Sequence, residues 1–159
     1  MRAREEQFRA FYAEEYPGLA RYAYRLLSDT DLAHDLAQEA FSRLYGRWVH
    51  VTEPRAYVFG IATNLARRAW KNRAREAALV ETLGRRREEP TSSHEAVVVL
   101  RASILGIPDK LRDVVLLHYF ADLSVAQVAT ATGRPEGTVK RQLSEARALL
   151  AIELGGQDD

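Results

Sequence analysis

Apolar residues recur every three or four positions along most of the chain, which is the spacing of an amphipathic α-helix. The first such stretch, residues 8–26, contains Pro17-Gly18, a pair expected to kink or restart the helix. Residues 28–31 form a polar turn with good N-cap residues for a second helix over 32–48. Pro54 then opens a third helix that runs to about Arg75, because proline suits the first helical position.

The helical pattern resumes after a break in the middle of the chain. Residues 76–94 combine a run of charges with a Pro-Thr-Ser-Ser sequence and lack periodicity, which is typical of a linker. Helices are predicted over 95–105, 109–119, 125–131 and 135–152, and residues 155–159 are expected to form a disordered tail. The pattern therefore predicts an all-α protein with two small helical modules, residues 1–75 and 95–154, joined by a flexible linker.

Composition narrows the class of protein. Of the 159 residues 47% are hydrophobic and 28% charged, an ordinary globular balance, and the absence of cysteine excludes a disulfide scaffold and a thiol nucleophile. Apolar runs, such as those over residues 97–100 and 114–117, are far shorter than the about 20 residues of a membrane helix, and the charged N-terminus is unlike a secretory signal. We expect a soluble, cytoplasmic protein with no membrane insertion.

The net charge of +1 conceals one strongly basic segment. Residues 54–87 carry nine basic and two acidic side chains, a net charge of +7, so the rest of the chain is net acidic. Positive charge concentrated in one segment of a near-neutral protein predicts a localised site for a polyanion.

The clearest local motif is a helix-turn-helix within residues 124–150. Ser124 can N-cap its first helix, Ala129 is small where the two helices cross, and Gly133 suits a turn that needs a positive φ. Pro135 opens the second helix at its first position, and Val139 anchors that helix in the core. An ordinary helical hairpin is the alternative, but turn chemistry and face pattern together favour a DNA-reading helix. Its outward face carries Lys140, Arg141, Ser144, Glu145 and Arg147.

A second pattern lies on the helix predicted over residues 54–75. One side of that helix is apolar, and the other aligns an aromatic ring and an amide with four cations. Cations neutralise phosphates, whereas an aromatic ring and an amide can hold an unstacked base, although a solvated arginine-rich face is the simpler alternative. The neighbouring residues 49–53 form either a base-sized pocket or a plain connector. The stripe consists of Tyr57, Asn64, Arg67, Arg68, Lys71 and Arg75, and Trp70 falls nearer the apolar side.

Catalytic and metal-binding patterns are missing from the sequence. The four histidines are scattered without ligand spacing, and there is neither a glycine-rich phosphate loop nor a nucleophile elbow. We therefore expect neither an enzyme nor a bound metal or cofactor. The second helix has an outward polar face that taken alone is only a solvated surface, formed by Asp35, Gln38, Glu39, Ser42 and Arg43.

Three groups of residues resemble the bacterial extracytoplasmic-function (ECF) sigma factors of the sigma-70 family. DLAHDLAQEAFSRLYGRW, residues 31–48, resembles their polymerase-binding helix, and PRAYVFGIATNLARR, residues 54–68, resembles their −10-reading helix. IPDKLRDVVLL, LSVAQVA and GRPEGTVK, which begin at residues 107, 123 and 133, resemble their −35-reading module. The resemblance spans nearly the whole chain in the right order.

This resemblance implies a dissociable subunit that binds core RNA polymerase, directs it to promoters and melts the −10 element. The polar face of the second helix would meet the polymerase clamp, and the stripe around Asn64 would meet the −10 single strand. The −35 duplex would be met by Arg134, Gly137, Thr138, Lys140, Arg141, Ser144, Glu145 and Arg147. Glu145 departs from the family, which commonly has a basic residue there.

Two further expectations accompany the resemblance. An anti-sigma factor is expected as a regulatory partner. The 19 linker residues, at about 3.3 Å each, could extend about 60 Å, which exceeds one turn of DNA, about 34 Å. The rival function is a stand-alone dimeric helix-turn-helix repressor, which would leave the stripe and the polar face of the second helix unexplained.

Overall fold

The computed structural model describes residues 2–82 and 102–155, and all regular structure in these ranges is helical. This confirms the all-α prediction. The elements are α1 (Arg2–Leu27), α2 (Thr30–Arg47), the 3-10 turn η1 (Trp48–His50), α3 (Pro54–Thr82), α5 (Asp109–Val115), the π-helical turn η2 (Leu116–Phe120), α6 (Val125–Thr132) and α7 (Glu136–Gly155). Residues 102–105 add a short helical stretch before α5.

The first three helices pack around one apolar core. α1 runs through Pro17 as one helix, so the predicted restart at that residue is wrong. Asp29 N-caps α2 by accepting a hydrogen bond from the Leu32 amide at 3.0 Å, as the polar turn predicts. α3 continues to Thr82, beyond the predicted end near residue 75, so the first part of the predicted linker is helical. The predicted linker residues 83–94 lie outside the described residues, as does the tail beyond Gly155.

Side chains of α3 fix the end of α1. The Trp70 indole Nε1 donates to the carbonyl oxygen of Leu26, and the Arg73 guanidinium donates to that of Leu27, both at 2.8 Å. The last carbonyls of a helix have no partner within it, and these bonds give two of them a donor from α3. Trp70 is 2% exposed, which confirms that it belongs to the core.

A buried polar pair also joins α1 to α3. The Tyr22 hydroxyl lies 2.7 Å from the Thr63 hydroxyl, which itself donates to the carbonyl oxygen of Phe59 at 2.7 Å. Thr63 has only one hydroxyl proton, so Tyr22 is the donor in the shared bond. Burial raises the pKa of Tyr22 above its ordinary value, and the phenol therefore stays protonated.

The helix-turn-helix forms as its local signals predict. Ser124 and Gln127 make a reciprocal capping box at the start of α6, and Gly133 ends that helix with φ of 68°. Ala129 and Val139 are buried where α6 and α7 meet. Pro135 stands just before α7 rather than at its first position, and α7 extends to Gly155.

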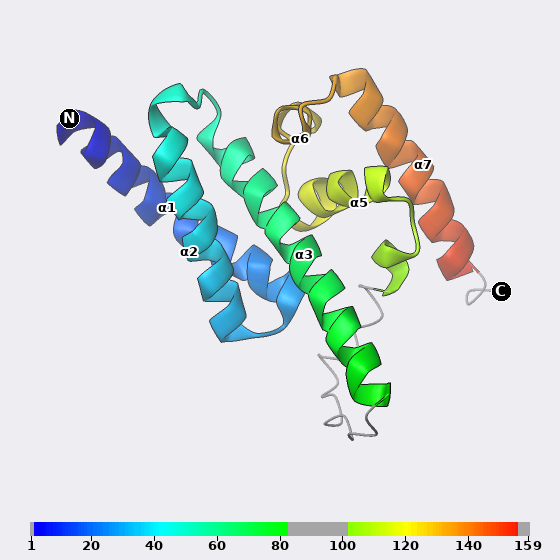
Figure 1. Ribbon diagram of the computed structural model, residues 1–159. Helices are drawn as coiled ribbons and strands as arrows, with labels where there is room; N and C mark the ends of the chain where they lie inside the picture. The colour runs from blue at the N-terminus through cyan, green and yellow to red at the C-terminus, as the bar shows by residue number, and fades with distance from the viewer. Residues whose placement is uncertain (1, 83–101, 156–159) are drawn as a thin grey trace.

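The two modules pack against each other rather than standing apart. α6 lies beside α3 (Figure 1), and η2 also contacts α3. Buried residues of both modules form one continuous apolar cluster. Gly60 marks the close approach, because a β-carbon there would lie 3.1 Å from the carbonyl oxygen of Ala131. Within the described ranges, no helix is long and apolar enough to cross a membrane.

The capping box gives a test of the second module. Replacing Ser124 by alanine removes an acceptor for the Gln127 amide, so we expect the free energy of unfolding to fall by about 1 kcal/mol. Urea denaturation followed by circular dichroism measures the change. Ser144→Ala, an exposed position within α7, is the matched control and should change stability by less than about 0.5 kcal/mol. Equal stabilities of the two variants would contradict a role for the cap.

Candidate nucleic-acid and protein interfaces

The predicted stripe on α3 surrounds a polar hollow of about 280 Å³. Asn64, Arg68 and Lys71 are exposed at this hollow, whereas Arg67 is largely covered. Of the other stripe residues, Arg75 is exposed farther along α3, and Tyr57 is half-buried against the core. The structure thus brings together four of the six residues. The hollow is lined by Arg43, Ile61, Asn64, Arg67, Arg68 and Lys71.

Arg43 joins this hollow from α2. The sequence pattern groups it with the polar face of α2, but its side chain lies at the edge where α2 meets α3. Its Nε donates to Glu39 at 2.9 Å, one helical turn earlier, and both side chains are about half exposed. Four cations therefore surround the hollow, and their positive charge suits an anion such as a phosphate.

The other polar side chains predicted on α2 all face solvent. Asp35, Gln38, Glu39 and Ser42 are exposed, while Leu36, Ala37, Ala40 and Phe41 are buried on the opposite side. The structure thereby places these residues together on one accessible surface.

An aromatic cluster supports that surface, and the sequence analysis missed it. The Gln38 amide donates to the Tyr12 hydroxyl at 2.9 Å, and the Tyr16 hydroxyl lies 2.8 Å from Nδ1 of His34. The aromatic residues of α1 and α2 recur at helical spacing, which was the available signal. The cluster consists of Phe8, Phe11, Tyr12, Tyr16, Phe41, Tyr45 and Trp48.

The α7 residues predicted to meet duplex DNA lie mainly on its exposed face. Gly137, Lys140, Arg141, Ser144, Glu145 and Arg147 are exposed and Thr138 is half-buried. Two of the charged side chains have partners in the same module. Arg147 donates to the Tyr119 hydroxyl at 2.9 Å, and the Glu145 carboxylate lies 4.0 Å from Nζ of Lys110.

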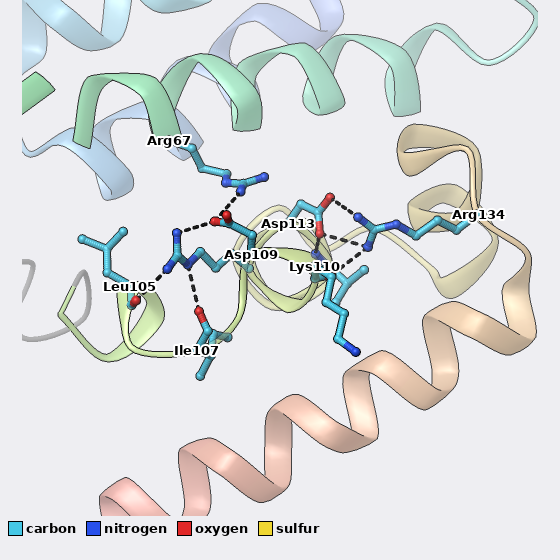
Figure 2. Close-up of polar contacts among 9 residues, drawn as sticks. Arg67, Leu105, Ile107, Asp109, Lys110, Asp113 and Arg134 are labelled. Carbon is cyan, nitrogen blue, oxygen red and sulfur yellow. Dashed lines mark hydrogen bonds and ion pairs between the residues drawn. The ribbon is translucent and has the colours of Figure 1, made fainter. Parts of the chain in front are cut away.

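Arg134 is engaged inside the second module. Its guanidinium makes two hydrogen bonds to the Asp113 carboxylate, at 2.8 and 3.1 Å, and one to the Lys110 carbonyl (Figure 2). It also donates to the Gln142 side chain at 2.9 Å. The side chains of Arg134 and Asp113 are 26% and 14% exposed. Arg134 therefore ties the turn of the helix-turn-helix to α5.

The fold and these surfaces define an all-helical protein with a helix-turn-helix in its second module. The family model described as Sigma-70 region 2 matches residues 11–76, and that described as Sigma-70, region 4 matches residues 98–150.

Named relatives and solved structures agree with both matches. RNA polymerase sigma-E factor of Streptomyces coelicolor is 31% identical over 96% of this chain and 88% of its own length. ECF RNA polymerase sigma factor SigL of Mycobacterium tuberculosis is 31% identical over 92% of this chain and 88% of its own. CnrH in complex with the cytosolic domain of CnrY has a TM-score of 0.67 at 19% identity, over 97% of this chain and 91% of that one. RpoE of Bartonella quintana, in complex with the anti-sigma factor NepR, has a TM-score of 0.60 at 22% identity, over 97% of this chain and 99% of that one.

This chain belongs to the ECF RNA polymerase sigma factors of the sigma-70 family. It is a promoter-directing transcription initiation factor, and the family is not one of known enzymes. A stand-alone repressor is not favoured, because the region 2 match covers the helices that such a repressor leaves unexplained.

The partners of Arg134 lead to a prediction. Arg134→Ala leaves the poorly exposed Asp113 carboxylate without its cation, so we expect the free energy of unfolding to fall by about 1.5–3 kcal/mol. Lys140→Ala changes an exposed residue of α7 and should keep the free energy of unfolding within about 0.5 kcal/mol of the wild-type value. Thermal denaturation of both variants makes the comparison. An Arg134→Ala protein as stable as Lys140→Ala would show that these bonds contribute nothing to folding.

Proposed function

We propose that the chain binds core RNA polymerase through α2, the −10 single strand through the hollow on α3 and the −35 duplex through α7. The observation that carries this proposal is the hollow itself. It combines the Asn64 amide, which can hydrogen-bond a base edge, with the cations Arg43, Arg67, Arg68 and Lys71. A flexible strand can place a phosphate and an unstacked base in such a site together, which a stiff duplex does less easily.

Arg43 has a different role in this proposal from the one its sequence position implies. Its side chain lines the hollow with the α3 cations, so it contacts the phosphate backbone of the −10 strand. The polymerase surface is then Asp35, Gln38, Glu39 and Ser42, which are exposed side by side on α2. Glu39 lies between the two surfaces and holds Arg43 by its ion pair.

On α7, Arg141 is the proposed reader of a guanine. Arg141 and Ser144 are exposed and point away from the buried Val139 and Leu143, which orients them toward a major groove. Glu145 faces Lys110 of α5, so its carboxylate has a cationic neighbour within its own module. We infer that Lys110 offsets the repulsion between this carboxylate and the DNA phosphates.

The proposed partners also include an anti-sigma factor. Both solved structures named above are complexes, and the partner of the Bartonella quintana protein is an anti-sigma factor. A chain that binds core polymerase and promoter DNA works in the cytoplasm, which is the compartment we propose.

The −10 assignment is tested with three single variants. Asn64→Ala should lose open-complex formation on duplex promoters while keeping polymerase binding, because it removes a base contact without changing charge. Arg43→Ala and Lys71→Ala should weaken binding to single strands of any sequence and reduce the salt dependence by about one unit each. Permanganate footprinting and salt titrations provide the readouts. If the Asn64→Ala protein melts promoters normally, the −10 base is bound elsewhere, and residues 49–53 are the next candidate for the base pocket.

The polymerase surface is tested by reversing two of its charges. Asp35→Lys with Glu39→Lys should weaken binding to core polymerase at least tenfold, since like charges across an interface are costly. Folding should be retained because both side chains are exposed. Glu5→Lys with Glu6→Lys makes the same charge change on the exposed start of α1 and serves as the control. If the α2 variant co-elutes with core polymerase to the same extent as the wild type, the assignment of α2 as the polymerase surface is wrong.

A further inference from the structure

The proposed DNA-reading side of α7 carries one acidic side chain, Glu145. It lies four residues after Arg141, and positions four apart on a helix point to nearly the same side. Both are exposed, whereas Val139, Leu143 and Ala146 are buried on the other side of α7. Four residues advance about 6 Å along a helix, which is less than two steps of about 3.4 Å between base pairs. Glu145 can therefore meet a base pair within two steps of the one that Arg141 meets.

The Glu145 carboxylate is not committed to a partner on its own helix. Across the part of the chain that the structure describes, its ion pair is with Lys110 of α5, at 4.0 Å, and not with Arg141. The side chains of Lys110 and Glu145 are 64% and 44% exposed, and an ion pair this exposed contributes little stability. The carboxylate can consequently turn to another donor at low cost.

Lys110 is held beside α7 through its backbone. Its carbonyl oxygen accepts a hydrogen bond from Arg134 at 2.8 Å, and its side chain extends toward α7 (Figure 2). Arg134 also binds Asp113, three residues later in α5. The backbone from which this cation extends is thereby fixed near Glu145. A cation in this place offsets the repulsion between the carboxylate and the phosphates of a bound duplex.

A carboxylate reads the major groove differently from an arginine or an amide, because it can only accept hydrogen bonds. Of the four bases, only cytosine and adenine present a donor there, the N4 and N6 amino groups. Adenine places the acceptor N7 beside its amino group, where it repels the second carboxylate oxygen, whereas cytosine has no acceptor in the groove. Guanine and thymine present acceptors alone and repel a carboxylate. A glutamate in the groove therefore favours cytosine on the strand that it faces and rejects guanine and thymine.

We propose that Glu145 selects a cytosine in the −35 element, within two base pairs of the guanine that Arg141 reads, and that Lys110 offsets its repulsion from the phosphates. This inference rests on the proposed function, since it takes α7 as the −35 reading surface. At other sequences the carboxylate finds no donor and weakens binding. It therefore raises the ratio of specific to non-specific affinity, which decides how well a protein finds its site among many competitors.

Selection from a promoter library randomised in the −35 and −10 regions tests the assignment, with holoenzymes formed from the wild-type chain and from three variants. Arg141→Ala marks the base pair at which guanine is read, because that preference is lost. Glu145→Gln should change the cytosine to adenine, since an amide pairs with N6 and N7, and Glu145→Arg should change it to guanine. Both changes should fall at one base pair, within two of the marked one, and leave the marked guanine preferred.

Competition with single-base variants of the selected promoter measures the size of the effect. The wild-type holoenzyme should prefer cytosine over guanine or thymine on that strand by about 5- to 150-fold, the range that base contacts provide. Glu145→Ala should reduce this ratio to about twofold or less and raise the affinity for unrelated DNA. Glu136→Gln is the matched control and should leave the ratio unchanged. It removes the same charge from an exposed position nine residues earlier, on the opposite side of α7.

A double-mutant cycle tests the part assigned to Lys110. Lys110→Ala should weaken binding of the holoenzyme to the selected promoter, because the Glu145 carboxylate loses the cation beside it. In the Glu145→Gln background, measured on the adenine site that this variant selects, the loss should be smaller by about two- to fivefold, the range for an exposed ion pair. Equal losses in the two backgrounds would show that Lys110 does not act through Glu145, and this part of the proposal would be wrong.

The outcomes distinguish this inference from the proposed function. If the wild-type holoenzyme selects no −35 element, the reading role of α7 is wrong and so is the assignment of Glu145. If it selects an element that Arg141→Ala changes but that Glu145→Gln and Glu145→Arg leave as it is, α7 reads DNA and the cytosine contact alone is overturned. Selection of an A·T pair by the wild type, at the position that Glu145→Gln alters, would overturn that contact as well.

Discussion

The structure depends on α3, because different sides of this one helix face different neighbours. With 3.6 residues per turn, a helix can present separate stripes to separate neighbours, and α3 presents three. Val58, Ala62 and Ala66 are buried in the first module, and Gly60 faces α6. The remaining stripe carries Asn64, Arg68 and Lys71 to solvent. A change in the orientation of α3 would therefore disturb the core, the docking contact and the cationic hollow at the same time.

Features set by neighbouring residues could be predicted from the sequence. The capping box of Ser124, the positive φ of Gly133 and the exposed face of α7 follow from chemistry within a few residues. The exposed positions of Asp35 and Asn64 follow from helical periodicity alone. The length of α3 was underestimated because its charged stripe ends near Arg75, although the Ala-Ala-Leu sequence that follows contains good helix formers.

Features set by distant residues could not be predicted in this way. Arg134 reads as a DNA contact from its place in the motif, but its main partner, Asp113, is 21 residues earlier in the chain. Arg67 reads as one cation of a stripe, and its pairing with Asp109 appears only once the modules are docked. Arg43 reaches the hollow because α2 packs beside α3. In each case the tertiary arrangement decides which partner an arginine meets.

Gly60 has an evolutionary consequence. Glycine is a poor residue for the interior of a helix, by about 1 kcal/mol relative to alanine, so α3 sacrifices some intrinsic stability for a close approach to Ala131. A single mutation to alanine would strengthen the helix and crowd the approach at once. One codon therefore sets the balance between the intrinsic stability of α3 and the closeness with which the second module packs on it.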